Sequence, residues 1–283
     1  MKAFASPMKQ KNGIVDILIT AVSLAIGIVI IFPVVFAFMA AFMTLGEFSR
    51  YPPPFFPESF LNFDNFIHVF TQSPMLRYLL NSFYVSAVGS AVRLSFSVLA
   101  AFAIAFFEFR GKNFLFFMVL GTMMLPGDTL VIVNFLTIST LNLMDSYLGI
   151  MVVYFVAAMQ LFMLRQSFKS VPRELRDATS IDGGGDLRFM CHVLLPMSKP
   201  ILFTLYVQSF VSLWNLYLWP LLITNRTEMR TVQIGLAMLT TVEATNYDVV
   251  MAGVASVLIP SIVLFVFLRK TIVRGMISGA LVG

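Results

Sequence analysis

The sequence predicts an all-α, polytopic membrane protein, and its composition and long apolar runs are the observations that predict it. Of 283 residues, 59% are hydrophobic and only 12% are charged, whereas soluble domains carry about 25% charged residues. The apolar residues fall in blocks that approach the roughly 20 residues needed to cross a bilayer. Backbone groups inside a bilayer must pair internally, and no alternating barrel pattern is present, so we expect the spans to be helices.

Six apolar runs are long enough to serve as spans. The first is too long for a signal-peptide core, so we expect it to be retained. Helix breaks at Pro33, Pro126 and Pro220 are tolerable where neighbours or water pair the freed carbonyls. The predicted organisation is a cytoplasmic tail at residues 1–13 and a single transmembrane domain at 14–283, with an external loop at about 43–76. The spans are expected at residues 14–42, 81–107, 114–138, 147–164, 201–224 and 249–268.

The distribution of basic residues predicts the orientation. Of 19 Lys and Arg residues, 14 lie in the two terminal tails, at 110–112 and in the loop 165–199. Basic residues favour the cytoplasmic side of a membrane, so both termini and the loop 165–199 are expected there. Six spans give the even number that this arrangement requires. The net charge of +5 is therefore a topology signal and not the mark of a nucleic-acid partner.

The loop between the fourth and fifth spans, at about 169–198, is charged and rich in glycine. Ser170 and Pro172 are expected to start a helix there, by capping and by a proline in the first turn. Gly183-Gly-Gly185 is expected to end it, because glycine adopts positive φ without steric cost. A second short helix at 187–193 would be closed by Pro196. The sequence therefore predicts a helix–turn–helix that protrudes into water and binds a partner.

The first of these two helices carries a short apolar stripe on an otherwise charged surface. Leu175, Ala178 and Ile181 recur at a spacing of three, which places them on one face of a helix. A loop that only connected two spans would not need such a pattern. We therefore expect the stripe to contact another protein.

Two motifs of this loop resemble a known family. Pro172-x-Glu-Leu-x-Asp-Ala-Thr-x-Ile-Asp-Gly183 and Val193-x-Leu-Pro196 are similar to the EAA loop of permease subunits of bacterial ABC importers. The resemblance is closest to the carbohydrate-uptake group, which serves sugars, oligosaccharides and glycerol phosphate. It extends over nearly the whole chain, although the family's Glu-Ala-Ala reads Asp177-Ala-Thr179 here. Further matching segments are Asn81-Ser82, Met123-Met-Leu-Pro126, Trp214-Asn-x-Tyr-Leu-Trp-Pro220 and Glu228-Met-Arg-Thr-Val-Gln-Ile-Gly235.

The resemblance implies a mechanism and a set of partners. The chain would be a multi-pass subunit of a bacterial cell membrane, paired with a homologous but distinct permease, two ATPase subunits and an extracytoplasmic solute-binding protein. The loop would sit in a cleft of an ATPase, so that closure around ATP moves the helices towards the outward-facing state. The chain has no Gly-x-x-x-x-Gly-Lys-Ser/Thr phosphate loop, so ATP and Mg would bind the ATPase subunits and no cofactor would bind here. The residues implied in coupling are Glu174, Asp177, Ala178, Asp182, Gly183, Gly184, Leu195 and Pro196.

Four residues within the spans are candidates for the path of the solute. Arg93 falls near the middle of the second span, where a charge costs roughly 2.5 kcal/mol or more. It would either face a cavity and an anionic group such as phosphate, or pair with Asp128 or with carbonyls. Trp214, Asn215 and Tyr217 offer aromatic faces and an amide, which suit sugars, but helix packing and interfacial anchoring explain them as well.

No catalytic or metal site is apparent in the sequence. His68 and His192 lack carboxylate or cysteine neighbours at metal-ligand spacing, and no nucleophile–base pair is present. The chain is therefore not expected to be an enzyme. The alternative class is a secondary transporter or another non-ABC membrane subunit. A secondary transporter would need ionisable coupling residues and internal repeats.

Overall fold

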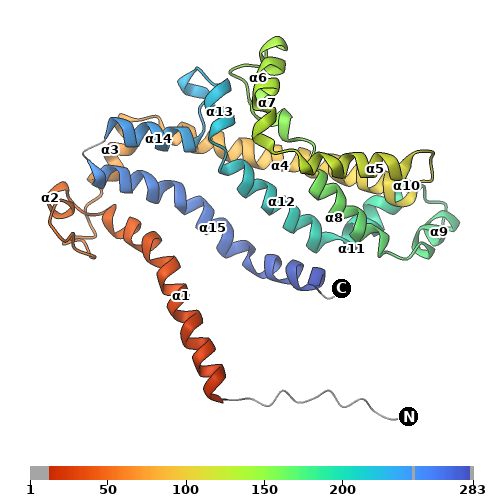
Figure 1. Cartoon of the computed structure of the whole chain (residues 1–283), viewed down its shortest axis with the longest axis horizontal. Helices are drawn as coiled ribbons and strands as arrows, with labels where there is room; N and C mark the ends of the chain where they lie inside the picture. Colours follow the sequence, from red (N-terminus) through yellow and green to blue (C-terminus); the bar gives the residue numbers. More distant parts are fainter. Residues whose placement is uncertain (1–12, 244–245, 281–283) are drawn as a thin grey trace. The chain divides into compact units, whose positions relative to one another are not determined.

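The computed structural model of the protein describes residues 13–243 and 246–280, apart from the side chains of 13–15, 128, 264–265 and 267–280. Every regular element in these residues is a helix, so the predicted all-α class is confirmed (Figure 1). The helices form two compact units. Unit 1 contains Met1–Val69 and Glu243–Ala255, and unit 2 contains Phe70–Val242 and Ser256–Gly283.

Unit 2 is built around one long helix, α4 (Met75–Phe106). This helix packs along α8 (Ala158–Lys169) and α12 (Lys199–Trp214). Its 32 residues exceed the roughly 20 that cross a bilayer. Apolar side chains from the three helices form a buried core near the C-terminal end of α4, and α10 (Asp186–Phe189) adds Phe189 to this core.

One buried amide joins the three packed helices. Gln160 of α8 is only 4% exposed, and its Nε2 donates to the carbonyl oxygen of Leu205 at 3.0 Å and to the hydroxyl of Ser209 on α12. The hydroxyl of Ser97 on α4 donates to its Oε1 at 3.3 Å. A buried amide costs free energy unless it is hydrogen-bonded. These bonds therefore favour one register of the three helices.

Two described helices are long and apolar enough to cross a membrane, at Asp16–Ala40 and Met75–Phe106. Two bent helix pairs have the same character when each pair is counted as one span. They are Tyr147–Tyr154 with Ala158–Lys169, bent by 54°, and Asp186–Met197 with Lys199–Trp214, bent by 80°. Length and composition thus support between two and four spans directly in the described residues.

The third and fifth predicted spans are each divided in the structure. The third consists of α5 (Lys112–Gly121) and α6 (Val131–Thr140), with Leu125 in an extended conformation before Pro126, because proline disfavours a helical residue before it. The fifth breaks between α12 and α13 (Leu218–Ile223). The break expected at Pro220 is therefore misplaced. Pro220 lies in the first turn of α13. Backbone N–H groups in the first turn make no hydrogen bond within the helix, so a proline there costs no bond.

Several shorter elements complete unit 2. The sequence did not predict α14 (Val232–Val242). In Figure 1, α9 (Glu174–Ile181) lies at one end of this unit and α14 at the other. The remaining helices of the unit are η1 (Thr122–Met124), η2 (Gly127–Leu130), α7 (Tyr147–Met151), η3 (Val152–Tyr154), η4 (Met190–Leu194), α11 (Leu195–Met197) and η5 (Thr227–Met229).

Unit 1 contains α1 (Gly13–Ala40), α2 (Leu45–Phe48), most of α3 (Asp64–Gln72) and the first part of α15 (Tyr247–Ala280). Helix α1 runs through Pro33 as one element. The amide of Asn65 donates to the carbonyl oxygens of Ala41 at 3.0 Å and Met43 at 2.7 Å. These carbonyls lie just beyond α1, where no helical N–H remains to pair them, so α3 is fixed to the end of α1.

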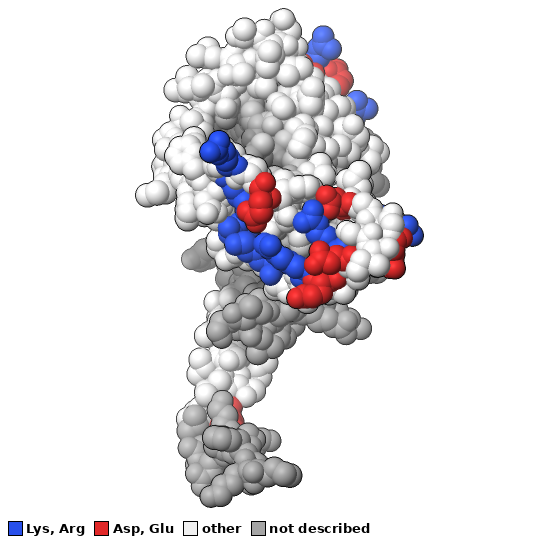
Figure 2. Space-filling model, turned by 90° about the vertical axis from the view of Figure 1, so that its right-hand side faces the viewer, with Lys and Arg blue, Asp and Glu red and all other residues white. Residues whose placement is uncertain are grey.

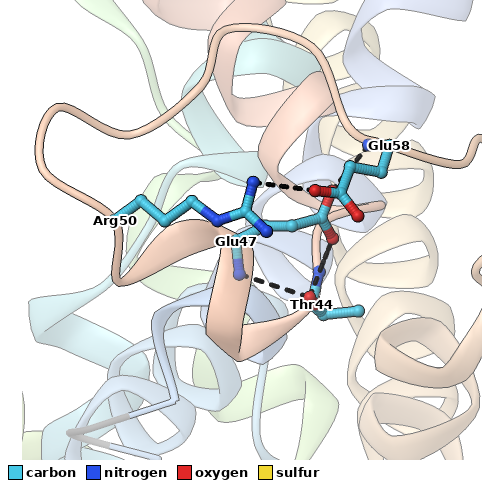
Figure 3. A network of polar contacts seen from close by, with 4 residues as sticks. All are labelled: Thr44, Glu47, Arg50 and Glu58. Atoms are coloured by element: carbon cyan, nitrogen blue, oxygen red, sulfur yellow. Dashed lines mark hydrogen bonds and ion pairs between the residues drawn. The ribbon is translucent and has the colours of Figure 1, made fainter.

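A small polar network orders the segment that follows α1 (Figure 3). Glu47 is only 4% exposed. Its carboxylate accepts from the backbone N–H of Thr44 at 2.7 Å, from the Thr44 hydroxyl at 2.8 Å and from the backbone N–H of Glu58 at 2.6 Å. Thr44 and Glu47 form a capping box around α2. Arg50 pairs with the side chain of Glu58 at 2.7 Å.

Candidate functional site

The candidate coupling segment begins at α9, one turn beyond the end of α8. Glu174 and Asp177 lie in its first turn, where negative side chains interact favourably with the helix dipole. The expectation that Ser170 caps this helix is wrong. Ser170 instead closes α8, and its hydroxyl donates to the carbonyl oxygen of Ser167 at 2.7 Å. The position preceding α9 is Arg173, which provides no side-chain cap.

The turn after α9 is set by hydrogen bonds that only glycine accommodates well. The backbone N–H of Gly184 donates to the carbonyl oxygen of Thr179 at 2.8 Å, and that of Gly183 donates to Ser180 at 3.1 Å. This pair of bonds is the Schellman arrangement, which needs a residue with positive φ after the helix. Gly183 has a φ of 76°. A Cβ at Gly184 would lie 2.9 Å from the carbonyl oxygen of Thr179, so both glycines are required by the backbone.

One arginine ties α9 to the rest of unit 2. The Nε of Arg176 donates to Asp186 Oδ1 of α10 at 2.8 Å, and its Nη1 donates to the carbonyl oxygen of Phe106 at 2.8 Å. Its guanidinium also lies 5.3 Å from the ring centroid of Phe107. The Phe106 carbonyl ends α4 and has no helical donor. Arg176 therefore connects both halves of the coupling segment to the end of the central helix.

The second half of the segment is longer than predicted. Helix α10 continues through the π-helical turn η4 and α11 as far as Met197, so the expectation that Pro196 closes a helix at 187–193 is wrong. Pro196 cannot donate a bond back to the preceding turn and its ring crowds that turn, and the wider π-helical turn lies directly before α11. Phe189 and Leu194 are fully buried, which anchors this half in the core.

The outward face of α9 is accessible. Leu175 is 36% exposed and Ile181 is 86% exposed, and Leu187 of α10 is 70% exposed; Ala178 is exposed as well. The predicted stripe thus faces away from the described part of unit 2. Of the eight residues implied in coupling, Gly184 is buried and Leu195 half-buried, and the exposed ones are Glu174, Asp177, Ala178, Asp182, Gly183 and Pro196.

Arg93, the first candidate for the solute path, lies on α4 and is half-buried. Its Nε is buried without a hydrogen-bond partner among the described residues. The side chain of Asp128, one partner considered for it, lies outside the described residues. A buried guanidinium nitrogen without an acceptor costs free energy. Arg93 therefore has an unused donor in the described part of the chain.

The three remaining candidates lie at the break between α12 and α13. Trp214 is 3% exposed and stacks on Phe210 with ring centroids 6.0 Å apart, so its ring packs inside unit 2. Asn215 and Tyr217 are exposed. Asn215 accepts a bond from Gln233 Nε2 of α14 at 3.3 Å. The structure therefore brings Asn215 to α14, and the sequence signal for this contact was missed because α14 was not predicted.

Sequence reasoning also missed Arg176. In the sequence Arg176 is one of several cations in a basic loop, and its partners on α4 and α10 are distant in sequence. The charge pattern alone contains no signal that separates Arg176 from Arg173 or Arg188.

Comparisons with known proteins agree with the geometry. A family model described as "Binding-protein-dependent transport system inner membrane component" matches residues 94–278. The chain is 32% identical, over 98% of its length and all of the relative, to the arabinooligosaccharides transport system permease protein AraQ of Halalkalibacterium halodurans. It is 34% identical to the sn-glycerol-3-phosphate transport system permease protein UgpE of Yersinia pestis, over 91% of this chain and 94% of the relative.

A solved structure has the same fold. It is the crystal structure of a bacterial ABC transporter involved in the import of the acidic polysaccharide alginate, with a TM-score of 0.82 and 22% identity over 94% of this chain and 99% of the matched chain. The family model covers more than half of the chain, and two relatives exceed 30% identity over nearly all of it. The chain therefore belongs to the family of inner membrane components of binding-protein-dependent transport systems.

Proposed function

We propose that this chain is the permease subunit of an ATP-driven importer that moves a carbohydrate-type solute into the cytoplasm. The solute class is a sugar, an oligosaccharide or glycerol 3-phosphate, which is supported by the printed names of the relatives. The chain is a translocation subunit and not an enzyme. Family membership favours this function over a secondary transporter.

The assembly that we propose has a second, homologous permease, two ATPase subunits and an extracytoplasmic solute-binding protein. ATP and Mg would bind the ATPase subunits. Six spans cross the membrane, with both termini and α9 in the cytoplasm. The distribution of Lys and Arg supports this orientation, since basic residues favour the cytoplasmic side.

One observation carries the coupling role that we propose for α9. Leu175, Ala178 and Ile181 form an exposed apolar stripe on a helix that is held by Arg176 and by the turn at Gly183. An apolar face costs free energy in water unless a partner covers it. Because α9 is fixed to the end of α4, a force applied to the stripe reaches the central helix.

The test compares two substitutions on α9 in the reconstituted importer. Ala178→Arg places a long charged side chain in the stripe, and Ser180→Arg places the same side chain on another face of the same helix. We expect Ala178→Arg to lower binding-protein-stimulated ATP hydrolysis and solute uptake together, by about tenfold or more, as expected for loss of roughly 1.4 kcal/mol of contact energy. Ser180→Arg should keep most of both activities.

The readouts are ATP hydrolysis and uptake across a panel of sugars and glycerol phosphates. Co-purification of both variants with the ATPase, at equal yield of the chain, controls for folding. If Ala178→Arg assembles with the ATPase and keeps wild-type rates of stimulated ATP hydrolysis and uptake, α9 is not the coupling element.

A further inference from the structure

A second site lies beside the coupling segment, on the same end of unit 2. A pocket of about 410 Å³ opens where the turn after α4 meets the end of α8. Figure 2 shows Lys and Arg side chains gathered on this end of unit 2, with Asp and Glu side chains beside them. Four cationic side chains line the pocket against a single carboxylate, that of Glu108; they are Lys112, Arg165, Lys169 and Arg173.

The single carboxylate is shared by two of the four cations. Glu108 pairs with Lys112 at 3.1 Å and with Arg173 at 3.7 Å. Within the described ranges, no carboxylate lies within ion-pairing distance of Arg165 or Lys169. The pocket therefore concentrates positive charge that the described residues do not neutralise.

Arg165 has a buried donor that no described residue pairs. It lies on α8 and is only 9% exposed, yet it lines the pocket. Its guanidinium is 3.9 Å from the ring centroid of Phe116, which fixes its position. Its Nε is buried and has no hydrogen-bond partner in the described part of the chain. Buried charged donors are normally paired, so a ligand with anionic oxygen atoms would complete this site.

The first turn of α5 contributes to the same pocket independently. Gly111 precedes this ten-residue helix and offers no side-chain cap, and Lys112, Asn113 and Phe114 line the pocket. The N–H of Lys112 donates to the carbonyl oxygen of Phe109 at 3.4 Å, whereas those of Asn113 and Phe114 have no helical partner and lie at the positive end of the helix dipole. Phosphate groups bind such helix ends readily.

The surroundings of the pocket favour a lipid over a small soluble anion. Apolar side chains of α5 are exposed at the pocket and beyond it: Phe114, which lines the pocket, is 68% exposed, and Phe117 is 66% exposed. A second pocket of about 260 Å³ shares Lys169 and Arg173 with the first, and apolar side chains of α4, α8 and the segment before α9 line the rest of it. Basic pockets at the cytoplasmic ends of spans bind anionic headgroups that have hydrocarbon next to them.

We propose that this pocket binds the phosphate of an anionic phospholipid of the cytoplasmic leaflet, held by Arg165, Lys169 and the first turn of α5. The proposal rests on the membrane orientation proposed above. It does not depend on the coupling role of α9, because lipid binding is measured without ATP hydrolysis.

The test uses the purified full-length chain and native mass spectrometry with phosphatidylglycerol, phosphatidylcholine and inorganic phosphate as probes. The pocket variant is Lys169→Gln, at an exposed side chain. The matched control is Arg110→Gln, which removes the same charge from an exposed residue next to the pocket that does not line it. We expect one tightly bound phosphatidylglycerol in the wild type and in Arg110→Gln, and about tenfold weaker retention in Lys169→Gln.

Each other outcome overturns the proposal. If phosphatidylcholine were retained as well as phosphatidylglycerol, the headgroup charge would play no part in binding. If both variants lost phosphatidylglycerol equally, the lipid would be attracted by the overall positive charge of this surface and not by the pocket. Saturable binding of inorganic phosphate that displaces the lipid would assign the pocket to a free anion. A cross-link from Lys169→Cys to the ATPase in the assembled importer, with loss of the lipid, would assign it to an acidic residue of that subunit. Unchanged melting temperatures of both variants keep the comparison valid.

Discussion

At the residue scale, single polar side chains decide how segments that are distant in sequence are joined. Arg176 donates a hydrogen bond to the carbonyl oxygen at the end of α4 and pairs with Asp186 of α10. Gln160 links three helices, and Asn65 pairs carbonyls just beyond α1. Arg176 and Asn65 pair carbonyls that the helices leave without a partner, whereas Gln160 adds a second bond to the Leu205 carbonyl inside α12.

Glu47 gives a prediction about pH. Hydrogen bonds from the backbone N–H groups of Thr44 and Glu58, in that order of size, hold the pKa of Glu47 below its ordinary value of 4.5. The ionised carboxylate therefore stabilises the segment after α1 fully above about pH 4.5, and this contribution is lost as the pH falls through the lowered pKa. Glu47→Gln replaces one acceptor oxygen by an amide that faces N–H donors. It should cost about 1.5–3 kcal/mol at pH 7, and this cost should shrink as the pH falls through the lowered pKa of Glu47.

Limited proteolysis of the segment 43–63, measured from pH 7 to pH 3, checks this expectation. Glu58→Gln is the matched control, because among the described residues its side chain makes only an exposed ion pair with Arg50, and such pairs contribute about 0–1 kcal/mol. A Glu47→Gln variant as resistant as the control at pH 7 would contradict the prediction.

At the element scale, the coupling segment is a short helix whose direction is fixed at both ends. Arg176 anchors α9 near its first turn, and the paired glycines reverse the chain after it. The residues after the turn enter the core through Phe189 and Leu194. The segment is therefore held at both ends and keeps an accessible face, as the proposed coupling role requires.

The glycine turn allows a comparison between two neighbouring positions. A Cβ at Gly184 would lie 2.7 Å from Thr179 Cγ2 and 2.9 Å from the Thr179 carbonyl oxygen, whereas a Cβ at Gly185 would have no neighbour within 4 Å. We expect Gly184→Ala to displace the end of α9, with a cost of about 1–3 kcal/mol, and to lower stimulated ATP hydrolysis. Gly185→Ala should behave as wild type in the same assay. Equal activities of the two variants would mean that the turn need not keep this geometry.

At the scale of the whole molecule, the apolar helices and the family both indicate that the chain lies in a membrane. The long apolar helices α1 and α4 and the two bent pairs belong to a chain whose family consists of inner membrane components. The proposed sidedness rests on the basic residues alone.

Sidedness can be measured by cysteine labelling. The native Cys191 is exposed, so it is first replaced by serine. In that background, Gly185→Cys should resist an impermeant thiol reagent applied outside intact cells, and Pro53→Cys, which is also at an exposed position, should react. Both should react after the membrane is permeabilised. Labelling of Gly185→Cys from outside would reverse the orientation and remove the coupling role of α9.

The sequence by itself determined the helical class, the membrane character, the family motifs and the glycine turn after α9. These follow from composition, run length and local backbone preference, which act over a few neighbouring residues. Only the tertiary structure decided where the fifth span breaks, that Ser170 ends α8, that Pro196 lies inside a continuing segment and that Trp214 packs inward. It alone brought Arg176 to the end of α4 and gathered the basic pocket around Arg165. Such contacts join positions far apart in the chain, and they depend on which backbone groups and cavities the packed helices leave unfilled.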